Sequence, residues 1–403
     1  MAGSVTVTPV PLTITAPGAT ITYGSPVPSI TASYSGFVNG DTAGSLTTAP
    51  SCSTTAGGRP IGTYPSSCSG AVDANYTFVY VPGSVTVLPP LLTITASSAT
   101  ITYGSAAPAI TATYSGFVNG DTAGSLTTAP SCTTNAGGQP VGTYATSCSG
   151  AVDANYTIVY VPGSVTFTPA PLTVTAKDVR RLFGAPNPAL TATITGFVNG
   201  DGPAVVTGSP NCATTAIQPS PGGRYAINCA QGTLAATNYA FSTFVPGTLT
   251  VGYTTVVTGT VPGFTVSAGQ SVLIARGAVV NGGITVNAGG ALDIEGAKIA
   301  GLTSSGATAV RICGSTTAGP LSISKTTGLV VVGDDEDRSS LPACVGNTIK
   351  NPVTISGNFG GVEFDGNTVS GPLVIQSNTG TTPDGNTVDV TGNSVSGKIS
   401  VQP

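Results

Sequence analysis

The chain has 403 residues, of which 7% are charged, and its formal net charge is −4. It contains 55 Gly and 31 Pro but neither His nor Trp, a composition that favours short strands and turns over helices. Its acidic balance leaves no basic surface for phosphates, and Lys177, Arg180 and Arg181 form the only local cationic cluster. No apolar run approaches the ~20 residues of a membrane helix. We therefore expect a nearly all-β chain that neither binds nucleic acid nor spans a membrane in this segment.

One segment of 17 residues occurs twice without a change. GFVNGDTAGSLTTAPSC runs from Gly36 to Cys52 and again from Gly116 to Cys132, and a diverged third copy, GFVNGDGPAVVTGSPNC, begins at Gly196. The starting points are 80 residues apart each time. This period indicates tandem copies of one self-contained unit, because length is additive whereas a catalytic site is needed only once.

Each unit has the same order of alternating runs and turns. It opens with a strand such as LTITA at Leu12, in which Leu and Ile share one face and Thr the other, followed by a YG turn at Tyr23. The GFVNGD turn, a cysteine-bearing stretch, an ANY segment and a closing VPGSVTV strand complete the unit. Turns at roughly 8- to 12-residue spacing predict a two-sheet antiparallel β-sandwich, either immunoglobulin-like or another small antiparallel sandwich or grasp.

These residues resemble the MBG domain of the YGX type, a repeat of bacterial surface proteins. The landmarks are the LTxTA-like strand, the YG pair, the GFxNGD turn, the ANY segment and the VPGxLTV-like closing strand, in three copies over residues 9–252. The resemblance implies that the chain belongs to a large secreted or surface-anchored bacterial protein. Many proteins with such repeats are considered adhesins, and the family supplies no catalytic residue. The third copy departs at Phe183, which precedes Gly184 where the other copies have Tyr, so a packing role persists but a hydroxyl hydrogen bond does not.

The closing strand occurs four times, whereas the body of the unit occurs three times. We therefore interpret residues 1–8 as the closing strand of an upstream repeat, and the chain as a segment of a longer protein. The linkers PVP, PP and PAP fix φ between units, which predicts a stiff rod. The expected domains are residues 9–88, 89–168 and 169–252 for the three repeats and 253–403 for a different architecture.

The eight cysteines fall in pairs, one pair in each repeat and one in the segment that follows. Zinc is a poor explanation, because the chain has no His and no C-x-x-C pair. One disulfide per unit fits better, implies an oxidising, extracytoplasmic setting and stabilises each unit by roughly 3 kcal/mol in the chain-entropy model. The expected structural disulfides are Cys52 with Cys68, Cys132 with Cys148, Cys212 with Cys229, and Cys313 with Cys344.

After Tyr253 short apolar pairs recur between Gly- and Asn-rich corners. Successive rungs carry pairs of inward apolar residues, for example Val353 with Ile355, in the segments GNTIKNPVTI, GNTVSGPLVI and GNSVSGKISV. Rungs of this kind predict a parallel β-helix of about seven rungs, and the segment is similar to the Asn- and Gly-rich right-handed β-helix repeats of secreted bacterial proteins. We expect three asparagines to stack at one corner: Asn347, Asn367 and Asn393.

Catalysis is confined to carboxylate chemistry, because a chain without His lacks the usual base for Ser or Cys nucleophiles. Asp293 with Glu295, and Glu363 with Asp365, are spaced two apart on expected strands and would face outward, as the acid, base or calcium ligands of β-helical glycoside hydrolases and lyases do. Against this hypothesis, residues 254–403 contain no Tyr, Trp or His on which a sugar ring could stack.

The remaining acidic residues have simpler interpretations. The run Asp334–Asp337 is either a solvated loop or a calcium site completed by backbone carbonyls. Asp73, Asp153 and the Asp of each GFVNGD copy are expected to be turn residues whose carboxylates accept hydrogen bonds from nearby amides. No cofactor, catalytic residue or other metal ligand is predicted.

The sequence thus predicts a non-enzymatic segment of a bacterial cell-surface or extracellular fibrous protein or adhesin, a disulfide-stapled stalk that ends in a β-helix. Its partners would be neighbouring repeats of the parent protein or other copies of itself, and surface glycans or matrix proteins at the solenoid. Two alternatives are a self-assembling filament, in which the strand GSVTVTP adds to an open edge of another molecule, and a β-helical polysaccharide-degrading enzyme.

Overall fold

The computed structural model describes residues 3–333, 344–383 and 385–403. These residues form strands, turns and three short 3₁₀ segments. The chain divides into two compact units, Met1–Ala170 and Pro171–Pro403. The first unit contains repeats 1 and 2, and the second contains repeat 3 and the C-terminal segment. The finer boundaries expected at residues 8, 88, 168 and 252 stay predictions.

Each repeat contains seven strands and one 3₁₀ turn. Repeat 1 contains β1 (Val10–Thr15), β2 (Ala19–Thr22), β3 (Ser33–Ser35), η1 (Ala43–Ser45), β4 (Ser51–Thr54), β5 (Gly62–Ser69), β6 (Tyr76–Val81) and β7 (Gly83–Leu88). Repeat 2 contains β8 (Leu91–Ala96), β9 (Ala99–Thr102), β10 (Ala112–Ser115), η2 (Ala123–Ser125), β11 (Ser131–Thr134), β12 (Gly142–Ser149), β13 (Thr157–Val161) and β14 (Gly163–Thr168). Repeat 3 contains β15 (Ala170–Ala176), β16 (Val179–Leu182), β17 (Ala192–Thr195), η3 (Pro203–Val205), β18 (Asn211–Thr214), β19 (Gly223–Ala230), β20 (Tyr239–Val245) and β21 (Gly247–Gly252).

The strands of each repeat form two sheets, ordered β3-β1-β6 and β2-β7-β5-β4 in repeat 1. The predicted class, three β-sheet repeats before a parallel β-helix, is confirmed. The pairing within the repeats needs a correction, because the sheets are mixed rather than wholly antiparallel: β1 runs parallel to β6, and β2 runs parallel to β7. The reason is that two chain segments, β1–β2 and β6–β7, each pass from one sheet into the other, and they run side by side in the same direction.

The glycine of each VPG motif makes this passage possible. A Cβ on Gly83 would lie 2.2 Å from the carbonyl oxygen of Ala16, and the corresponding distance from Gly163 to the carbonyl oxygen of Ala96 is 2.4 Å. The two crossing segments therefore touch backbone to backbone. The Ser66 hydroxyl, which is buried beside this crossing, donates a 2.9 Å hydrogen bond to the carbonyl of Pro17.

The GFVNGD segment forms a tight turn. Asn39 and Gly40 both have positive φ, at 55° and 84°, and the Asp41 N–H donates a 3.0 Å hydrogen bond to the Val38 carbonyl. Consecutive positive φ values with this bond are typical of a type I′ turn, for which Asn-Gly is the preferred pair. The same geometry occurs in the other two copies.

The C-terminal segment is a parallel β-helix of seven rungs, made of three seven-stranded sheets. The first sheet contains β22 (Thr255–Val257), β25 (Ser271–Ile274), β28 (Ala291–Glu295), β31 (Ala309–Cys313), β34 (Val330–Gly333), β37 (Val362–Asp365) and β40 (Val388–Asp389). The second contains β23 (Thr260–Val261), β26 (Val279–Val280), β29 (Lys298–Ile299), β32 (Thr316–Thr317), β35 (Thr348–Ile349), β38 (Thr368–Val369) and β41 (Ser394–Val395). The third contains β24 (Thr265–Val266), β27 (Ile284–Val286), β30 (Leu302–Ser305), β33 (Leu321–Ser324), β36 (Val353–Ser356), β39 (Leu373–Gln376) and β42 (Ile399–Val401).

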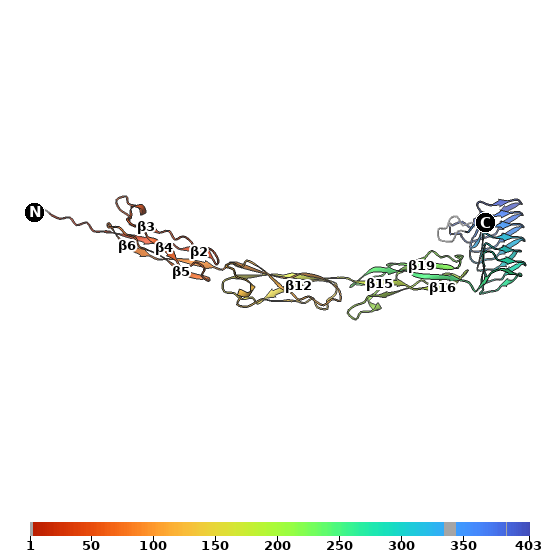
Figure 1. Ribbon diagram of the computed structural model, residues 1–403, viewed down its shortest axis with the longest axis horizontal. Helices are drawn as coiled ribbons and strands as arrows, with labels where there is room; N and C mark the ends of the chain where they lie inside the picture. Colours follow the sequence, from red (N-terminus) through yellow and green to blue (C-terminus); the bar gives the residue numbers. More distant parts are fainter. Residues whose placement is uncertain (1–2, 334–343, 384) are drawn as a thin grey trace. The chain divides into compact units, whose positions relative to one another are not determined.

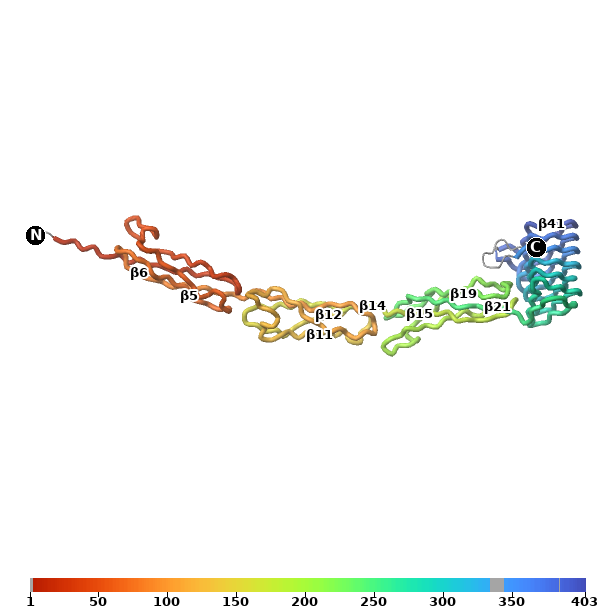
Figure 2. Tube along the Cα trace, in the orientation of Figure 1, coloured from red at the N-terminus to blue at the C-terminus, as the bar shows by residue number. Residues whose placement is uncertain are grey.

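Figure 1 shows the rungs as a stack of short parallel strands at the blue end of the chain, and Figure 2 traces their successive coils. Inward side chains fill the interior, and the predicted pair Val353 and Ile355 is fully buried. The predicted asparagine stack is also present: the Asn347 amide donates to Asn367 at 2.9 Å, and Asn367 donates to Asn393 at 3.1 Å. A second ladder, which was not predicted from the sequence, joins Asn358 to Asn378 at 2.8 Å.

Within the described residues, no helix has the length and apolar character needed to cross a membrane.

Replacing Gly83 with Ala should destabilise repeat 1 by about 1–3 kcal/mol, because the added Cβ must displace the backbone of Ala16. The midpoint of chemical unfolding measures this change. Gly44→Ala is the matched control, since Gly44 is exposed and a Cβ there would lie 3.7 Å from its nearest neighbour. Equal midpoints for the two variants would contradict the proposed backbone crossing.

Candidate functional site

The Tyr-Gly turn of each repeat lies where the chain leaves that repeat. In repeat 1 the Tyr23 N–H donates a 2.9 Å hydrogen bond to the carbonyl of Leu88, the last residue of the closing strand β7. Phe183 makes the same bond to Gly252 at 2.8 Å in repeat 3. Parallel pairing of β2 with β7 produces this geometry, since Thr22 is the register partner of Leu88. The pairing therefore places the turn beside the linker to the next module.

An acceptor site faces this turn at the start of repeat 2. It consists of Val118 and Asp121 from the GFVNGD loop and Tyr156 from the ANY segment. The Tyr156 hydroxyl donates a 2.7 Å hydrogen bond to Asp121 and accepts a 3.1 Å bond from the Val118 N–H. The same Tyr–Asp bond joins Tyr76 to Asp41 at 2.8 Å in repeat 1.

This finding corrects the interpretation of the GFVNGD aspartates. Asp41, Asp121 and Asp201 each accept a hydrogen bond from the hydroxyl of a tyrosine 35 to 38 residues further along the chain. Asp73 and Asp153 do act as expected, because each accepts a hydrogen bond from the backbone N–H two residues later.

The Tyr-Gly turn of repeat 1 occupies the acceptor site of repeat 2. The Tyr23 hydroxyl donates a 3.3 Å hydrogen bond to Asp121, and its ring packs edge to face on Tyr156 with a centroid distance of 5.8 Å. A Cβ on Gly24 would lie 2.7 Å from the Cβ of Val118, so only Gly allows this approach. The YG motif is thus a contact between modules as well as a turn, a role that its sequence alone does not reveal.

Repeat 3 uses the equivalent turn to contact the β-helix. The Phe183 ring, which is 1% exposed, joins a cluster with Ala291 and Ala309 of the first solenoid sheet and lies 5.7 Å from the Tyr253 ring. A Cβ on Gly184 would lie 2.5 Å from the Cβ of Ala291. Phe183 meets alanine methyl groups instead of an acceptor carboxylate, which explains why this copy carries no hydroxyl.

A buried arginine supports the same junction. Arg181, part of the predicted cationic cluster, is 8% exposed and donates to Asn187 and to the carbonyls of Leu182, Ile217 and Gln218. The Gln218 amide then donates to the carbonyls of Gly184 at 2.7 Å and Thr308 at 3.1 Å. Arg181 is therefore a structural residue of repeat 3 and not part of a cationic surface.

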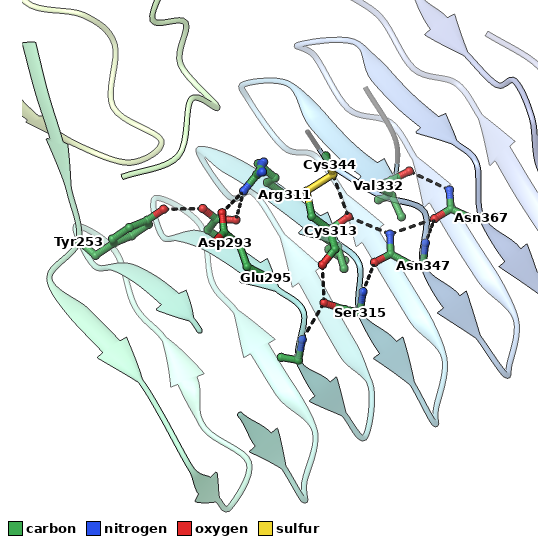
Figure 3. The surroundings of a disulfide bond; sticks show 12 residues. Tyr253, Asp293, Glu295, Arg311, Cys313, Ser315, Val332, Cys344, Asn347 and Asn367 are labelled. Atoms are coloured by element: carbon green, nitrogen blue, oxygen red, sulfur yellow. Dashed lines mark hydrogen bonds and ion pairs between the residues drawn. A yellow bond between two sulfur atoms is a disulfide. The ribbon is translucent and has the colours of Figure 1, made fainter. Parts of the chain in front are cut away.

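The first candidate carboxylate pair lies in this junction as well (Figure 3). Asp293 is fully buried, accepts a 2.5 Å hydrogen bond from the Tyr253 hydroxyl and pairs with Arg311 at 2.9 Å. Arg311 also pairs with Glu295 at 2.7 Å. Burial raises the pKa of Asp293 to about 6, although Arg311 and Tyr253 act in the opposite direction. Asp293 points away from the solenoid core, as expected, because its neighbours Leu292 and Ile294 lie in that core. Tyr253 and Arg311 nevertheless cover Asp293, so it is not open to a substrate.

The second candidate pair is divided between two environments. Glu363 is 3% exposed, whereas Asp365 accepts hydrogen bonds from the N–H and hydroxyl of Thr391 at 2.6 and 2.9 Å. The candidate calcium run Asp334–Asp337 lies outside the described residues. Among the residues that are described, no group of three or more Cys, Asp or Glu side chains is arranged to hold a metal ion.

The cysteines form four disulfides. Cys52 and Cys68 are direct cross-strand partners on β4 and β5, with Cα atoms 4.0 Å apart. Cys132 with Cys148 and Cys212 with Cys229 repeat this arrangement. Cys313 is bonded to Cys344 on the β-helix, beside the asparagine ladder shown in Figure 3.

The MBG domain (YGX type) family matches residues 12–86, 92–166 and 172–250. No curated protein sequence matches the chain significantly. Among solved structures, the crystal structure of Drosophila N-cadherin EC1-4 is similar at 9% identity, covering 63% of this chain and 79% of that chain. Its TM-score is 0.15, too low to support any argument about fold or function.

Loss of the Tyr156 hydroxyl should remove a titration step near pH 12. Burial, together with the neighbouring Asp121 carboxylate, raises the pKa of Tyr156 to about 12 from the usual value near 10. Because the folded protein favours the neutral phenol, the associated stability is complete below about pH 10 and is lost as the pH rises towards 12. Absorbance titration of the protein and of Tyr156→Phe measures the step. A variant that loses a titration step near pH 10, instead of one near pH 12, would contradict the raised pKa of Tyr156.

Replacing Arg311 with Met should destabilise the β-helix by about 3–5 kcal/mol, because it leaves the buried Asp293 carboxylate without its cationic partner. Chemical unfolding followed by circular dichroism measures the loss. Arg276→Met is the control, since Arg276 lies exposed just after β25 and should change stability by less than about 0.5 kcal/mol. Similar effects of the two substitutions would contradict a structural role for the Asp293–Arg311 pair.

Proposed function

Because the chain belongs to the MBG (YGX type) repeat family, we propose that it is a non-enzymatic stalk segment of a bacterial cell-surface or extracellular fibrous protein. MBG repeats indicate a surface-protein segment, and four disulfides fit an extracellular protein. The repeats extend the stalk, and the β-helix is the part presented for attachment to surface glycans or matrix proteins, as an adhesin requires.

The contact of Tyr23 with Asp121 and Tyr156 is the observation that carries this proposal. The Tyr-Gly turn recurs in repeats 1 and 2, with Phe183 in its place in repeat 3, and the Asp–Tyr acceptor recurs in all three repeats. Each added repeat of the Tyr-Gly type therefore brings both the turn for the next contact and the acceptor for the previous one. Two consecutive prolines, Pro89 and Pro90, connect the same two repeats and restrict φ at the linker. A covalent linker and a side-chain contact together restrain the junction, which supports a stiff spacer.

The enzyme alternative receives less support. A glycosidase needs two carboxylates that reach the substrate, but Asp293 is covered by Tyr253 and Arg311, and Glu363 is 3% exposed. Release of reducing ends from pectin or another acidic glycan by the purified protein would contradict the non-enzymatic proposal.

Deletion of residues 89–168, which removes repeat 2, should shorten the protein by one repeat length and leave repeat 1 and the β-helix folded as before. The segment from Val10 to Tyr23 is nearly continuous extended chain, so a repeat spans roughly 45 Å at about 3.3 Å per residue. After the deletion Tyr23 can meet the acceptor residues of repeat 3, which are Val198, Asp201 and Tyr239. Small-angle X-ray scattering measures the maximum dimension before and after deletion.

The control is deletion of residues 89–168 together with Tyr23→Ala. This variant should have the same contour length but a broader distribution of dimensions, because the linker remains and the side-chain contact is lost. A maximum dimension that does not change on deletion would contradict the stalk.

A further inference from the structure

Repeat 1 carries the same acceptor site that Tyr23 occupies in repeat 2. Its GFVNGDTAGSLTTAPSC sequence is identical, and the internal bonds are the same: Tyr76 donates to Asp41 at 2.8 Å and accepts from the Val38 N–H at 3.2 Å. In the described part of the chain no Tyr-Gly turn lies on it, and Val38 is 40% exposed, whereas Val118 is half-buried. The two sites thus share one sequence and differ in occupancy.

The unoccupied site is a pocket of about 250 Å³. Val38, Asp41 and Tyr76 line it together with residues 7–10. It therefore offers an apolar contact, an aromatic ring and a carboxylate acceptor, the three groups that receive Tyr23 and Gly24 in repeat 2. This chemistry fits a phenol ring that carries a hydroxyl donor and is followed by Gly.

The segment that leads into the pocket has the sequence of a closing strand. Residues 3–7 read GSVTV, as do residues 83–87 at the start of β7. In β7 the two valines, Val85 and Val87, are 0% and 3% exposed, but Val5 and Val7 are 90% and 89% exposed. β7 pairs with β2, and the Tyr-Gly turn follows directly after β2. The β2-like strand of another repeat, paired with residues 3–8 in the same register, would therefore place its own Tyr-Gly turn at the pocket.

We propose that the acceptor site of repeat 1 binds the Tyr-Gly turn of another MBG repeat, joined in tandem through residues 3–8 as its closing strand. The inference rests on the proposed stalk function and identifies the partner at this end of the segment. A second copy of this chain is a poor source, because two of its turns are already occupied: Tyr23 lies in repeat 2, and Phe183 lies against the β-helix and is 1% exposed. The Asp41 carboxylate selects Tyr over Phe at the turn.

The test uses an extended chain in which a second copy of residues 89–168 replaces residues 1–8. Hydrogen exchange of the peptide 31–41 reports on the acceptor loop of repeat 1, and Ser33 distinguishes it by mass from the equivalent peptides, which contain Thr113. Extension should slow exchange in this peptide roughly tenfold, because one aromatic pair and one hydrogen bond to a carboxylate stabilise the docked loop by about that factor. Tyr→Ala at position 103 of the added copy should abolish the gain, and Tyr→Phe there should leave part of it.

Two controls complete the design. In the original chain, Tyr23→Ala should accelerate exchange in the peptide 111–121 by the same factor, because it empties the acceptor site of repeat 2. An extended chain that shows no slowing, or slowing that survives Tyr→Ala, would overturn the docking proposal. In the original chain, exchange of the peptide 31–41 that becomes slower as the protein concentration rises would also overturn the proposal, because it would show that a second copy of the chain occupies the site.

Scattering from the extended chain separates the docking proposal from the stalk proposal. A maximum dimension longer by one repeat without slower exchange rejects docking and retains the stalk. A dimension that does not increase rejects the stalk itself.

Discussion

The fold of each repeat depends on one constraint, the parallel pairing of its closing strand with the strand that precedes the Tyr-Gly turn, as β7 pairs with β2 in repeat 1. It requires two chain segments to cross between sheets with their backbones in contact, which is why Gly83 and its counterparts stand where they do. It also sets the position of the turn, since Tyr23 is tied to the end of β7. Architecture inside one repeat thus determines where that repeat can touch the next module.

The same turn serves two different neighbours with a small change in chemistry. Between repeats 1 and 2 a tyrosine hydroxyl reaches Asp121, and against the β-helix a phenylalanine packs on two alanines. The β-helix contributes its own polar link, in which Tyr253, Asp293 and Arg311 form a buried chain. The last repeat has therefore adapted to a different partner by the loss of a single oxygen atom.

Much of the fold could be predicted from the sequence, because repetition and alternation record burial directly. The inward valines and isoleucines of the rungs and the stack of Asn347, Asn367 and Asn393 followed from their spacing. The parallel pairing did not, since strand direction depends on contacts between residues about 65 apart, such as Thr22 and Leu88. The acceptor site was missed for a related reason: the recurring Tyr and Asp are separated by 35 residues in repeat 1, and no local pattern joins them. The fate of Asp293 depended on Arg311 and Tyr253, which approach it only in three dimensions.

The directions of β1–β2 and β6–β7 determine how a repeat bears load. The chain enters a repeat at Val10 and leaves it at Leu88, at opposite ends of two neighbouring segments that run the same way. Tension between these points slides the two segments past each other, so their evenly spaced backbone hydrogen bonds resist in shear, all together, instead of opening one after another. The disulfide between Cys52 and Cys68 also limits how far an unfolded repeat can extend, because tension then passes through the S–S bond and the residues between the two cysteines bear none of it.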